Sequence, residues 1–151
     1  MIISDCITPI FLNFLLSCID DTKVTGSCSG TFDPMKNEIK SPNYPKNYNN
    51  NENCTWRIVA STDSTVVLNY EDFSLENSKN CKYDYLEISD GNTLPIGHHS
   101  ISKVCGDKNP VKTFSNRKAL HMKFVSGKIE TRSGFKIAYS TKSKEIGFYS
   151  C

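Results

Sequence analysis

Several features that identify common classes of protein are absent from this 151-residue sequence. It has no long run of one charge and a formal net charge of only +2, which argues against a nucleic-acid partner. No segment reaches the roughly 20 apolar residues that a membrane-spanning helix needs. No window has a sustained helical period, and no internal repeat is visible. These absences leave a chain with the length of one ordinary domain.

The motifs of common hydrolases are also missing. The sequence contains neither the Gly-x-Ser-x-Gly nucleophile elbow nor the His-Glu-x-x-His pattern of zinc peptidases. His98 and His99 lie together in a loop, where solvated side chains are expected. His121 alternates with Leu120 and Met122, so we expect it on the opposite strand face, solvated or hydrogen-bonded. We therefore predict that the protein is not an enzyme.

Cysteine, in contrast, is abundant. Seven cysteines occur, but none forms a C-x-x-C pair and no C-x-x-H follows, which argues against a zinc site. The sequence assigns no role to three of them, Cys6, Cys18 and Cys151. The other four predict two disulfides and an oxidising compartment, and their spacing allows three pairings: Cys28, Cys54, Cys81 and Cys105.

A short apolar segment lies close to the N-terminus, at residues 7–19. Its length fits the core of a signal peptide, although Asp5 precedes it and no Lys or Arg does. We expect residues 1–19 to be a signal peptide, with cleavage near Ser17 or as late as Gly26. The alternative is a partial chain whose first residue is not the native start.

Short alternating segments follow one another through the rest of the chain. Apolar residues recur at every second position in them, which is the period of a β-strand. Residues 20–27 are interpreted as a polar lead-in, and residues 92–102 as a loop. Many short strands separated by turns predict an all-β sandwich or barrel with antiparallel sheets. The expected strands are residues 38–41, 54–60, 65–73, 83–90, 104–106, 118–125 and 134–140.

The stretch at residues 81–91 combines a cysteine, a strand and a turn. Asp90-Gly91 ends the strand, because glycine accepts the backbone angles that tight turns need. Asp84 lies near the strand start, and Glu76 lies eight residues upstream, on a loop that a Cys81 disulfide would hold. Two carboxylates near one strand end could bind a hard cation. The simpler interpretation is that both are solvated loop charges.

The order of these segments resembles the CUB domain family, from Cys28 to about Tyr139. The resemblance implies a two-sheet antiparallel β-sandwich of the jelly-roll type over residues 28–140, with residues 141–151 as a C-terminal tail. It also implies the disulfides Cys28–Cys54 and Cys81–Cys105. The segments that carry it are Cys28-x-Gly30, Ile39-Lys40-Ser41-Pro42-Asn43-Tyr44-Pro45, Asn53-Cys54-x-Trp56-x-Ile58, Phe73-x-Leu75-Glu76, Cys81-x-Tyr83-Asp84-Tyr85-Leu86-x-Ile88, Asp90-Gly91, Cys105-Gly106, Phe124-x-Ser126 and Gly134-Phe135-x-x-x-Tyr139.

One subset of this family binds calcium, and the resemblance carries its ligand positions onto this chain. Glu76 and Asp84 match two acidic ligands, and Tyr48 matches the tyrosine that supports them. Gly127 stands where the third acid would be. Calcium affinity depends on the number of charged ligands, so a weak site is expected unless carbonyls, water or Glu130 compensate. The alternative is a vestigial site with two hydrogen-bonded or solvated acids.

The resemblance implies a secreted, extracellular module that binds a protein partner through loops at one end of the sandwich. One alternative is a lectin-like domain that binds glycans or glycosaminoglycans, which a cluster of Lys and Arg on one face would favour. The other is a fragment of a larger CUB-containing protease or receptor. We expect no nucleic-acid partner and no membrane span.

Two further features concern the surface. Asn53-Cys54-Thr55 is an N-glycosylation sequon, so Asn53 is a candidate for a glycan. Tyr44 and Tyr48 lie on a proline-rich loop and are the better candidates for exposed aromatic residues, although the family resemblance implies that part of this motif packs inward. The strand aromatics are expected in the core: Trp56, Tyr70, Tyr85, Phe124 and Phe135.

Overall fold

The computed structural model describes residues 23–26, 28, 32–33, 37–60, 63–91, 100–115, 117 and 119–143. Several predictions fall outside these residues: the signal peptide, the His98-His99 pair and the roles of Cys6, Cys18 and Cys151. Within the described part, no helix is long and apolar enough to cross a membrane.

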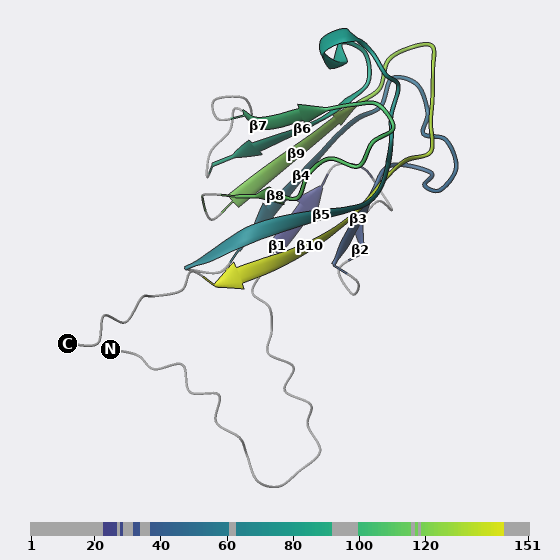
Figure 1. Ribbon diagram of the computed structural model, residues 1–151. Coiled ribbons are helices and arrows are strands. Elements are labelled where there is room, and N and C mark those ends of the chain that lie inside the picture. The colour runs from purple at the N-terminus through teal and green to yellow at the C-terminus, as the bar shows by residue number, and fades with distance from the viewer. Residues whose placement is uncertain are drawn as a thin grey trace, which may run out of the picture.

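Two five-stranded sheets make up the described part of the chain. The first has the order β1-β4-β9-β6-β7, with β1 (Lys23–Gly26), β4 (Asn53–Val59), β9 (Ala119–Val125), β6 (Tyr85–Asp90) and β7 (Ser100–Val104). The second has the order β2-β3-β10-β5-β8, with β2 (Phe32–Asp33), β3 (Glu38–Lys40), β10 (Gly134–Ser143), β5 (Ser64–Ser74) and β8 (Thr113–Phe114). All neighbouring strands are antiparallel, and the sheets face each other (Figure 1). The predicted antiparallel β-sandwich is confirmed.

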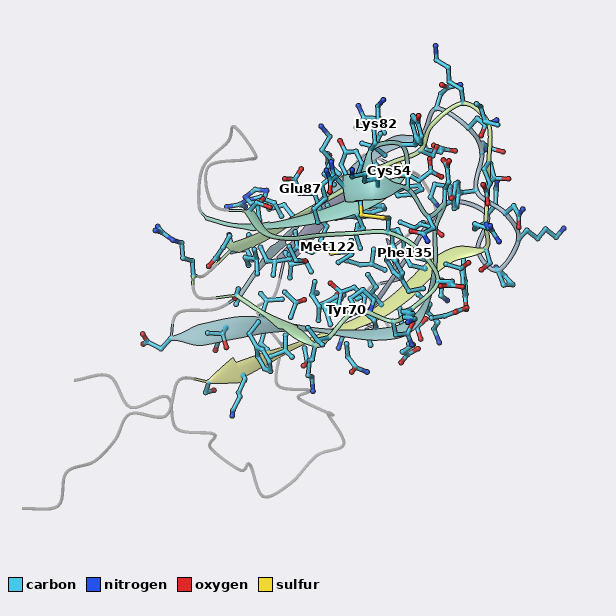
Figure 2. The ribbon with its side chains drawn as sticks, turned by 45° about the horizontal axis from the view of Figure 1, so that its top comes forward. Cys54, Tyr70, Lys82, Glu87, Met122 and Phe135 are labelled. Carbon is cyan, nitrogen blue, oxygen red and sulfur yellow. A yellow bond between two sulfur atoms is a disulfide. The ribbon has the colours of Figure 1, made fainter. Side chains whose placement is uncertain are left out.

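The core lies between the sheets and is built from the alternating apolar positions. Figure 2 shows Tyr70, Met122 and Phe135 pointing into this space. The Phe135 ring meets those of Phe124 and Trp56 edge to face, at centroid distances of 5.5 and 5.9 Å. Burying each large apolar side chain stabilises the fold by about 1.5–3 kcal/mol. The residues at most 2% exposed include Ile39, Trp56, Ile58, Val66, Leu68, Phe73, Leu86, Ile88, Leu120, Met122, Phe124, Phe135 and Ile137.

One predicted core aromatic is on the outside. Tyr85 is half-buried, and the Lys103 ammonium lies 3.9 Å from its ring centroid. The reason is register, because Leu86 and Ile88 take the inward positions of β6 and Tyr85 and Glu87 the outward ones. The prediction of a core position for Tyr85 is therefore wrong.

Several strand boundaries differ from the sequence prediction, and the short strands β2 and β8 were not expected. Residues 23–26, expected in a polar lead-in, pair with β4, and backbone hydrogen bonds of this kind need no apolar pattern. Residues 100–102, expected in a loop, belong to the edge strand β7, where side chains are mostly exposed and alternation is weak. The last strand ends at Ser143 rather than Ser140, because its pairing with β5 continues to Ser64.

Both disulfides that the family resemblance implied are present. Cys28 joins Cys54, with their Cα atoms 5.3 Å apart, and Cys81 joins Cys105, with their Cα atoms 5.5 Å apart. The sequence separations are 26 and 24 residues, and closing loops of this length stabilises a fold by about 3 kcal/mol each in the chain-entropy estimate. The second bridge holds the segment that leads into β6.

Three connections meet at one end of the sandwich, which we call the loop end (Figure 1). They are residues 41–52, residues 75–84 with the 3-10 helix η1 (Lys79–Cys81), and residues 126–133. The first and third are joined through their backbones: Asn51 N–H donates to the Gly127 carbonyl at 2.8 Å, and Tyr48 N–H to the Arg132 carbonyl at 3.1 Å. The candidate metal ligands lie in these connections.

Candidate metal centre

Asp84 lies at the centre of the loop end and is fully buried. Its Oδ2 accepts a hydrogen bond from the Tyr48 hydroxyl at 2.5 Å, and its Oδ1 accepts one from the Gly127 N–H at 2.6 Å. A buried carboxylate stays ionised only when such donors replace water. The two donors come from the other two connections, so Asp84 links all three connections and its orientation is fixed.

Tyr48 is buried rather than exposed, so its expected surface position is wrong. Its hydroxyl donates to Asp84 and accepts a hydrogen bond from the Glu76 N–H at 3.1 Å. Its ring packs edge to face on Phe124, with the centroids 5.2 Å apart. Burial and the neighbouring Asp84 raise the pKa of Tyr48, so the hydroxyl remains a donor. Tyr44 is half-buried and donates to Asp72 at 2.9 Å, away from this site.

Glu76 lies beside Asp84, as the resemblance implied, and its side chain is partly exposed. Burial raises the pKa of its carboxyl, and the negative charges of Asp84 and Glu130 raise it further. Arg132 opposes this effect. Two carboxylates that repel each other across a short distance are stabilised by a cation between them.

Gly127 lies close to both acids. A Cβ atom at this position would lie 3.1 Å from Asp84 Oδ1 and 3.8 Å from Glu76 Oε2. The φ angle of Gly127 is outside the left-handed region, so the backbone itself does not require glycine. The side chain of a third acid would therefore start next to both existing carboxylates, and glycine removes that ligand from the site.

The remaining ligand set suits calcium only in part. Calcium prefers six to eight oxygen ligands, and two carboxylates supply at most four. In the described residues, no third His, Cys, Asp or Glu completes a ligand cluster with Glu76 and Asp84. Glu130, the compensating acid considered from the sequence, forms an ion pair with Arg132. Carbonyl groups and water would have to provide the other oxygens.

A second group of potential ligands is not a metal site. Cys28, Glu52 and Cys54 have ligand atoms within 4.8 Å of one another. The two cysteines, however, form a disulfide, so neither sulfur is available as a thiolate.

A pocket of about 530 Å³ opens beside Glu76 and Gly127. Tyr83 and Ile129 line it, and their side chains are 50% and 91% exposed. Lys82, which points away from the core in Figure 2, places its ammonium 5.3 Å from the Tyr83 ring centroid. This pocket has no signal in the sequence, because Ile129 is a single apolar residue in a polar connection and no periodicity marks it.

Two other sequence candidates lie elsewhere on the first sheet. Asn53 is exposed at the start of β4, where its side chain is accessible for modification. His121 is buried, and its Nε2 lies 3.1 Å from the Gly91 carbonyl oxygen. Burial lowers the pKa of His121, which favours the neutral imidazole. Of the two predicted alternatives, a solvated or a hydrogen-bonded histidine, the structure has the second.

Comparison with known proteins identifies the same family along the chain. The CUB domain family model matches residues 28–139. The dorsal-ventral patterning protein tolloid of Drosophila melanogaster is 38% identical over 128 residues, which cover 80% of this chain and 11% of that protein. Human Tolloid-like protein 2 is 40% identical over 114 residues, which cover 72% and 10%. This chain thus spans about a tenth of the length of these relatives.

Solved structures give the same result. The MASP-1 CUB2 domain bound to Ca²⁺ superposes with a TM-score of 0.62 and 28% identity, covering 74% of this chain and 98% of that one. The full extracellular region of zebrafish Gpr126/Adgrg6 gives a TM-score of 0.62 and 27% identity, covering 70% and 13%. The family match over most of the residues, the antiparallel sandwich and these relatives show that the chain belongs to the CUB domain family.

Proposed function

We propose that this chain is a secreted, non-catalytic module that binds a protein partner through its loop end, with a weak calcium site at Glu76 and Asp84. The observation that carries the proposal is the contact of Asp84 with the other two connections, next to a second carboxylate. Loops on a rigid sheet scaffold are the usual position of binding residues. Two disulfides fit an oxidising, extracellular compartment.

Bound calcium would make the three connections of the loop end more ordered. When bound, the ion would neutralise the repulsion between the Glu76 and Asp84 carboxylates, which lie on one connection, and the Asp84 carboxylate accepts hydrogen bonds from the other two connections. The relative whose solved structure contains Ca²⁺ supports this assignment, since nearly all of that domain aligns with this chain. The missing acid at Gly127 is the reason to expect weak rather than tight binding.

Calorimetric titration with calcium chloride tests the site. The wild-type chain should bind one ion with a dissociation constant of about 0.1–1 mM or weaker. Glu76→Gln and Asp84→Asn keep the shape of each side chain and remove its charge, so each should abolish measurable binding. Circular dichroism of both variants checks that the fold is retained. Tight binding that survives Glu76→Gln would contradict the proposed site.

The lectin-like alternative lacks a specific observation in its favour. A cluster of basic side chains on one face would support it, and the outer face of the first sheet carries Lys103 and Lys123. The register, however, places Glu87 directly between these two lysines. Positive and negative charge alternate along this row, which is unlike the uniform basic surface that a sulfated glycan needs.

The larger-protein alternative is compatible with the proposed module. A single module of this length would be a small part of any chain as long as the relatives. An immunoblot of the natural source under reducing conditions, with an antibody against this domain, tests this alternative by measuring the mass of the whole chain. A mass far above that of 151 residues with one glycan would establish a larger parent chain.

A further inference from the structure

The two disulfides differ in how accessible their sulfur atoms are. In the Cys28–Cys54 disulfide, which we call the core bridge, Cys28 is partly exposed but Cys54 is fully buried in the hydrophobic core. In the Cys81–Cys105 disulfide, which we call the turn bridge, both residues are partly exposed. Thiol–disulfide exchange begins when a thiolate attacks one sulfur and the other sulfur leaves. Both sulfurs of the turn bridge can take either role, whereas only one sulfur of the core bridge can be attacked.

The surroundings of Cys54 make it a poor leaving group. An attack on Cys28 would expel Cys54 as a thiolate inside the apolar core. The nearest carboxylate oxygen, Glu52 Oε2, lies 4.0 Å from the Cys54 sulfur. Burial and a neighbouring negative charge both raise the free energy of a thiolate, and a less stable thiolate leaves more slowly. The core bridge is therefore protected on both sides of the exchange reaction.

The surroundings of Cys81 carry charge of the opposite sign. Lys79 and Lys82 lie within two residues of Cys81 on the same turn, and both are exposed. Positive charge stabilises a thiolate and attracts an anionic attacking thiolate, so an attack on Cys105 would expel Cys81 readily. The Ser78 carbonyl oxygen lies 3.7 Å from the Cys105 sulfur, where it can accept a hydrogen bond from that thiol after reduction.

The backbone of this turn is also strained. Asn80 has a φ of +58° and Cys81 a φ of +48°, both in the left-handed region. Asparagine adopts this region more easily than other residues with a Cβ, which remain in it only where the surrounding structure holds them. Two hydrogen bonds lie within the turn itself, from Cys81 N–H to the Ser78 carbonyl at 3.0 Å and from Tyr83 N–H to Ser78 Oγ at 3.3 Å. The turn bridge adds the covalent link to the residue after β7, and opening it lets Cys81 relax.

We propose that the turn bridge is a thiol–disulfide exchange site, which dithiols reduce while the core bridge stays intact. One thiolate of the dithiol attacks Cys105 Sγ, the S–S bond breaks, and Cys81 leaves as a thiolate. The second thiol of the reagent then attacks the mixed disulfide and releases Cys105. The dithiol is oxidised to its own disulfide, two electrons pass to the protein, and the two protons of the dithiol end on the two cysteine sulfurs.

Opening the turn bridge frees one connection of the loop end. Leu75 N–H donates to the Gly106 carbonyl at 2.8 Å, and β6 pairs with β9 from Tyr85 onward. Neither contact involves the disulfide, so both remain after reduction, and the segment that gains freedom is residues 76–84. This segment carries both acids of the proposed calcium site. Reduction should therefore weaken calcium binding, and this last step rests on the proposed function.

Differential alkylation of the full chain tests the exchange site. Free thiols are first blocked with iodoacetamide, dithiothreitol is then added without denaturant, and newly formed thiols are labelled with N-ethylmaleimide at intervals. Peptide mapping by mass spectrometry follows each cysteine separately. The cysteines of the turn bridge should be labelled at least about tenfold faster than those of the core bridge. Equal rates, or faster labelling of the core bridge, would overturn the proposal.

Two variants test the electrostatic explanation. Glu52→Gln removes the carboxylate beside Cys54 and should accelerate reduction of the core bridge about two- to fivefold, with the turn bridge unchanged. The double variant Lys79→Gln, Lys82→Gln should slow reduction of the turn bridge by a similar factor. Lys112→Gln is the matched control, since Lys112 is exposed and distant in sequence from all four cysteines, and it should change neither rate. Rates that stay the same in every variant would overturn this explanation.

Hydrogen exchange separates this inference from the proposed function. The double variant Cys81→Ser, Cys105→Ser has no turn bridge, and amide exchange in residues 76–84 should become at least about tenfold faster while β4 and β9 stay protected. Loss of protection throughout the sandwich would show that the bridge is required for folding, which overturns a reversible role. Neither labelling nor exchange needs an ion, so a chain that binds no calcium would contradict the proposed function alone. Equal calcium affinity of the oxidised and reduced chains would overturn the effect on the loop end.

Discussion

At the scale of single residues, Gly127 is the position that limits the affinity of the proposed calcium site. Its N–H supports Asp84, so the backbone already contributes to the site, and only the third carboxylate is missing. The Asp84 carboxylate is held by the Tyr48 hydroxyl and the Gly127 N–H, so this ligand would need little reorganisation when an ion enters. Calcium sites gain affinity from both ligand charge and rigidity, and this one has a rigid Asp84 but a low charge.

Replacing Gly127 with aspartate should strengthen the site. The new Cβ would lie 3.1 Å from Asp84 Oδ1, so the loop must shift by a few tenths of an ångström, and no positive φ opposes the change. A third carboxylate should tighten calcium binding about tenfold or more by calorimetry. Gly127→Asn is the matched control because it has the same shape without the charge. Equal calcium affinity of the two variants would contradict this account of the site.

The raised pKa of Glu76 predicts a pH dependence. Calcium binds the ionised carboxylate, so its affinity should fall as pH drops through the raised pKa, sooner than an ordinary glutamate would allow. Without calcium the sign for folding is opposite: the domain loses stability as pH rises from the ordinary value of 4.5 through the raised pKa. Denaturant titrations at several pH values in this range should show the free energy of unfolding of the wild type falling with pH more than that of Glu76→Gln. The same pH dependence in both proteins would refute this prediction.

Asn53 has the exposure that glycan attachment requires, although Cys54 in the middle of the sequon is in a disulfide. We expect a single N-linked glycan when the chain is expressed through the secretory pathway. Treatment with an N-glycosidase should reduce the mass of the wild type and not of Asn53→Gln. An identical mass before and after treatment would show that disulfide formation prevents attachment.

At the scale of elements, the start of β10 holds the loop end to the sandwich. Ser41 N–H donates to the Phe135 carbonyl at 3.0 Å, and Phe135 N–H donates to Ser41 Oγ at 2.9 Å. Gly134, between the connection and the strand, has a φ of +85°, and a Cβ atom there would collide with the Ser41 side chain. These contacts leave no room for any other residue at position 134.

Gly134→Ala should therefore destabilise the domain by at least about 2 kcal/mol, from the strained φ and the collision together. Gly91→Ala is the comparison, because Gly91 also has a positive φ but no atom within 4 Å of its added Cβ. Urea denaturation should give the smaller loss for Gly91→Ala. A Gly134→Ala variant as stable as the wild type would show that residues 41–52 are not fixed by β10.

The elements that the sequence predicted are those with one buried face. The alternation of apolar and polar residues in β4 and β9 is clear, because every second side chain enters the core: Trp56, Ile58, Leu120 and Met122. The edge strands β1 and β7 were not predicted, because backbone pairing forms them with little apolar patterning. The spacing of the four cysteines left three disulfide pairings open, and the family resemblance indicated which one to expect. The family resemblance named Tyr48 beside the acids, but its deep burial and the pocket that Ile129 lines were missed, because contacts in an irregular connection involve residues distant in sequence.

At the scale of the whole molecule, we expect the core and the disulfides to dominate stability and the proposed calcium ion to contribute only locally. Each disulfide stabilises the fold by about 3 kcal/mol in the chain-entropy estimate. An ion with a dissociation constant of about 1 mM adds only about 1.4 kcal/mol at roughly 10 mM calcium. Calcium should thus change the order of residues 41–52, 75–84 and 126–133 without determining whether the sandwich folds.

Thermal denaturation should separate these contributions. Chelating calcium with EDTA should lower the Tm of the wild type by a few degrees, about 5 °C at most. The Tm shift equals the lost free energy divided by the unfolding entropy, and the lost free energy is small. Glu76→Gln should show no such change, which makes it the control for non-specific effects of EDTA. Reducing both disulfides should lower the Tm far more. Amide hydrogen exchange should locate the calcium effect in the three connections, leaving β4, β9 and β5 protected. If EDTA instead unfolds the whole domain at room temperature, calcium is a structural ion here, and Glu76 and Asp84 cannot be its only acidic ligands.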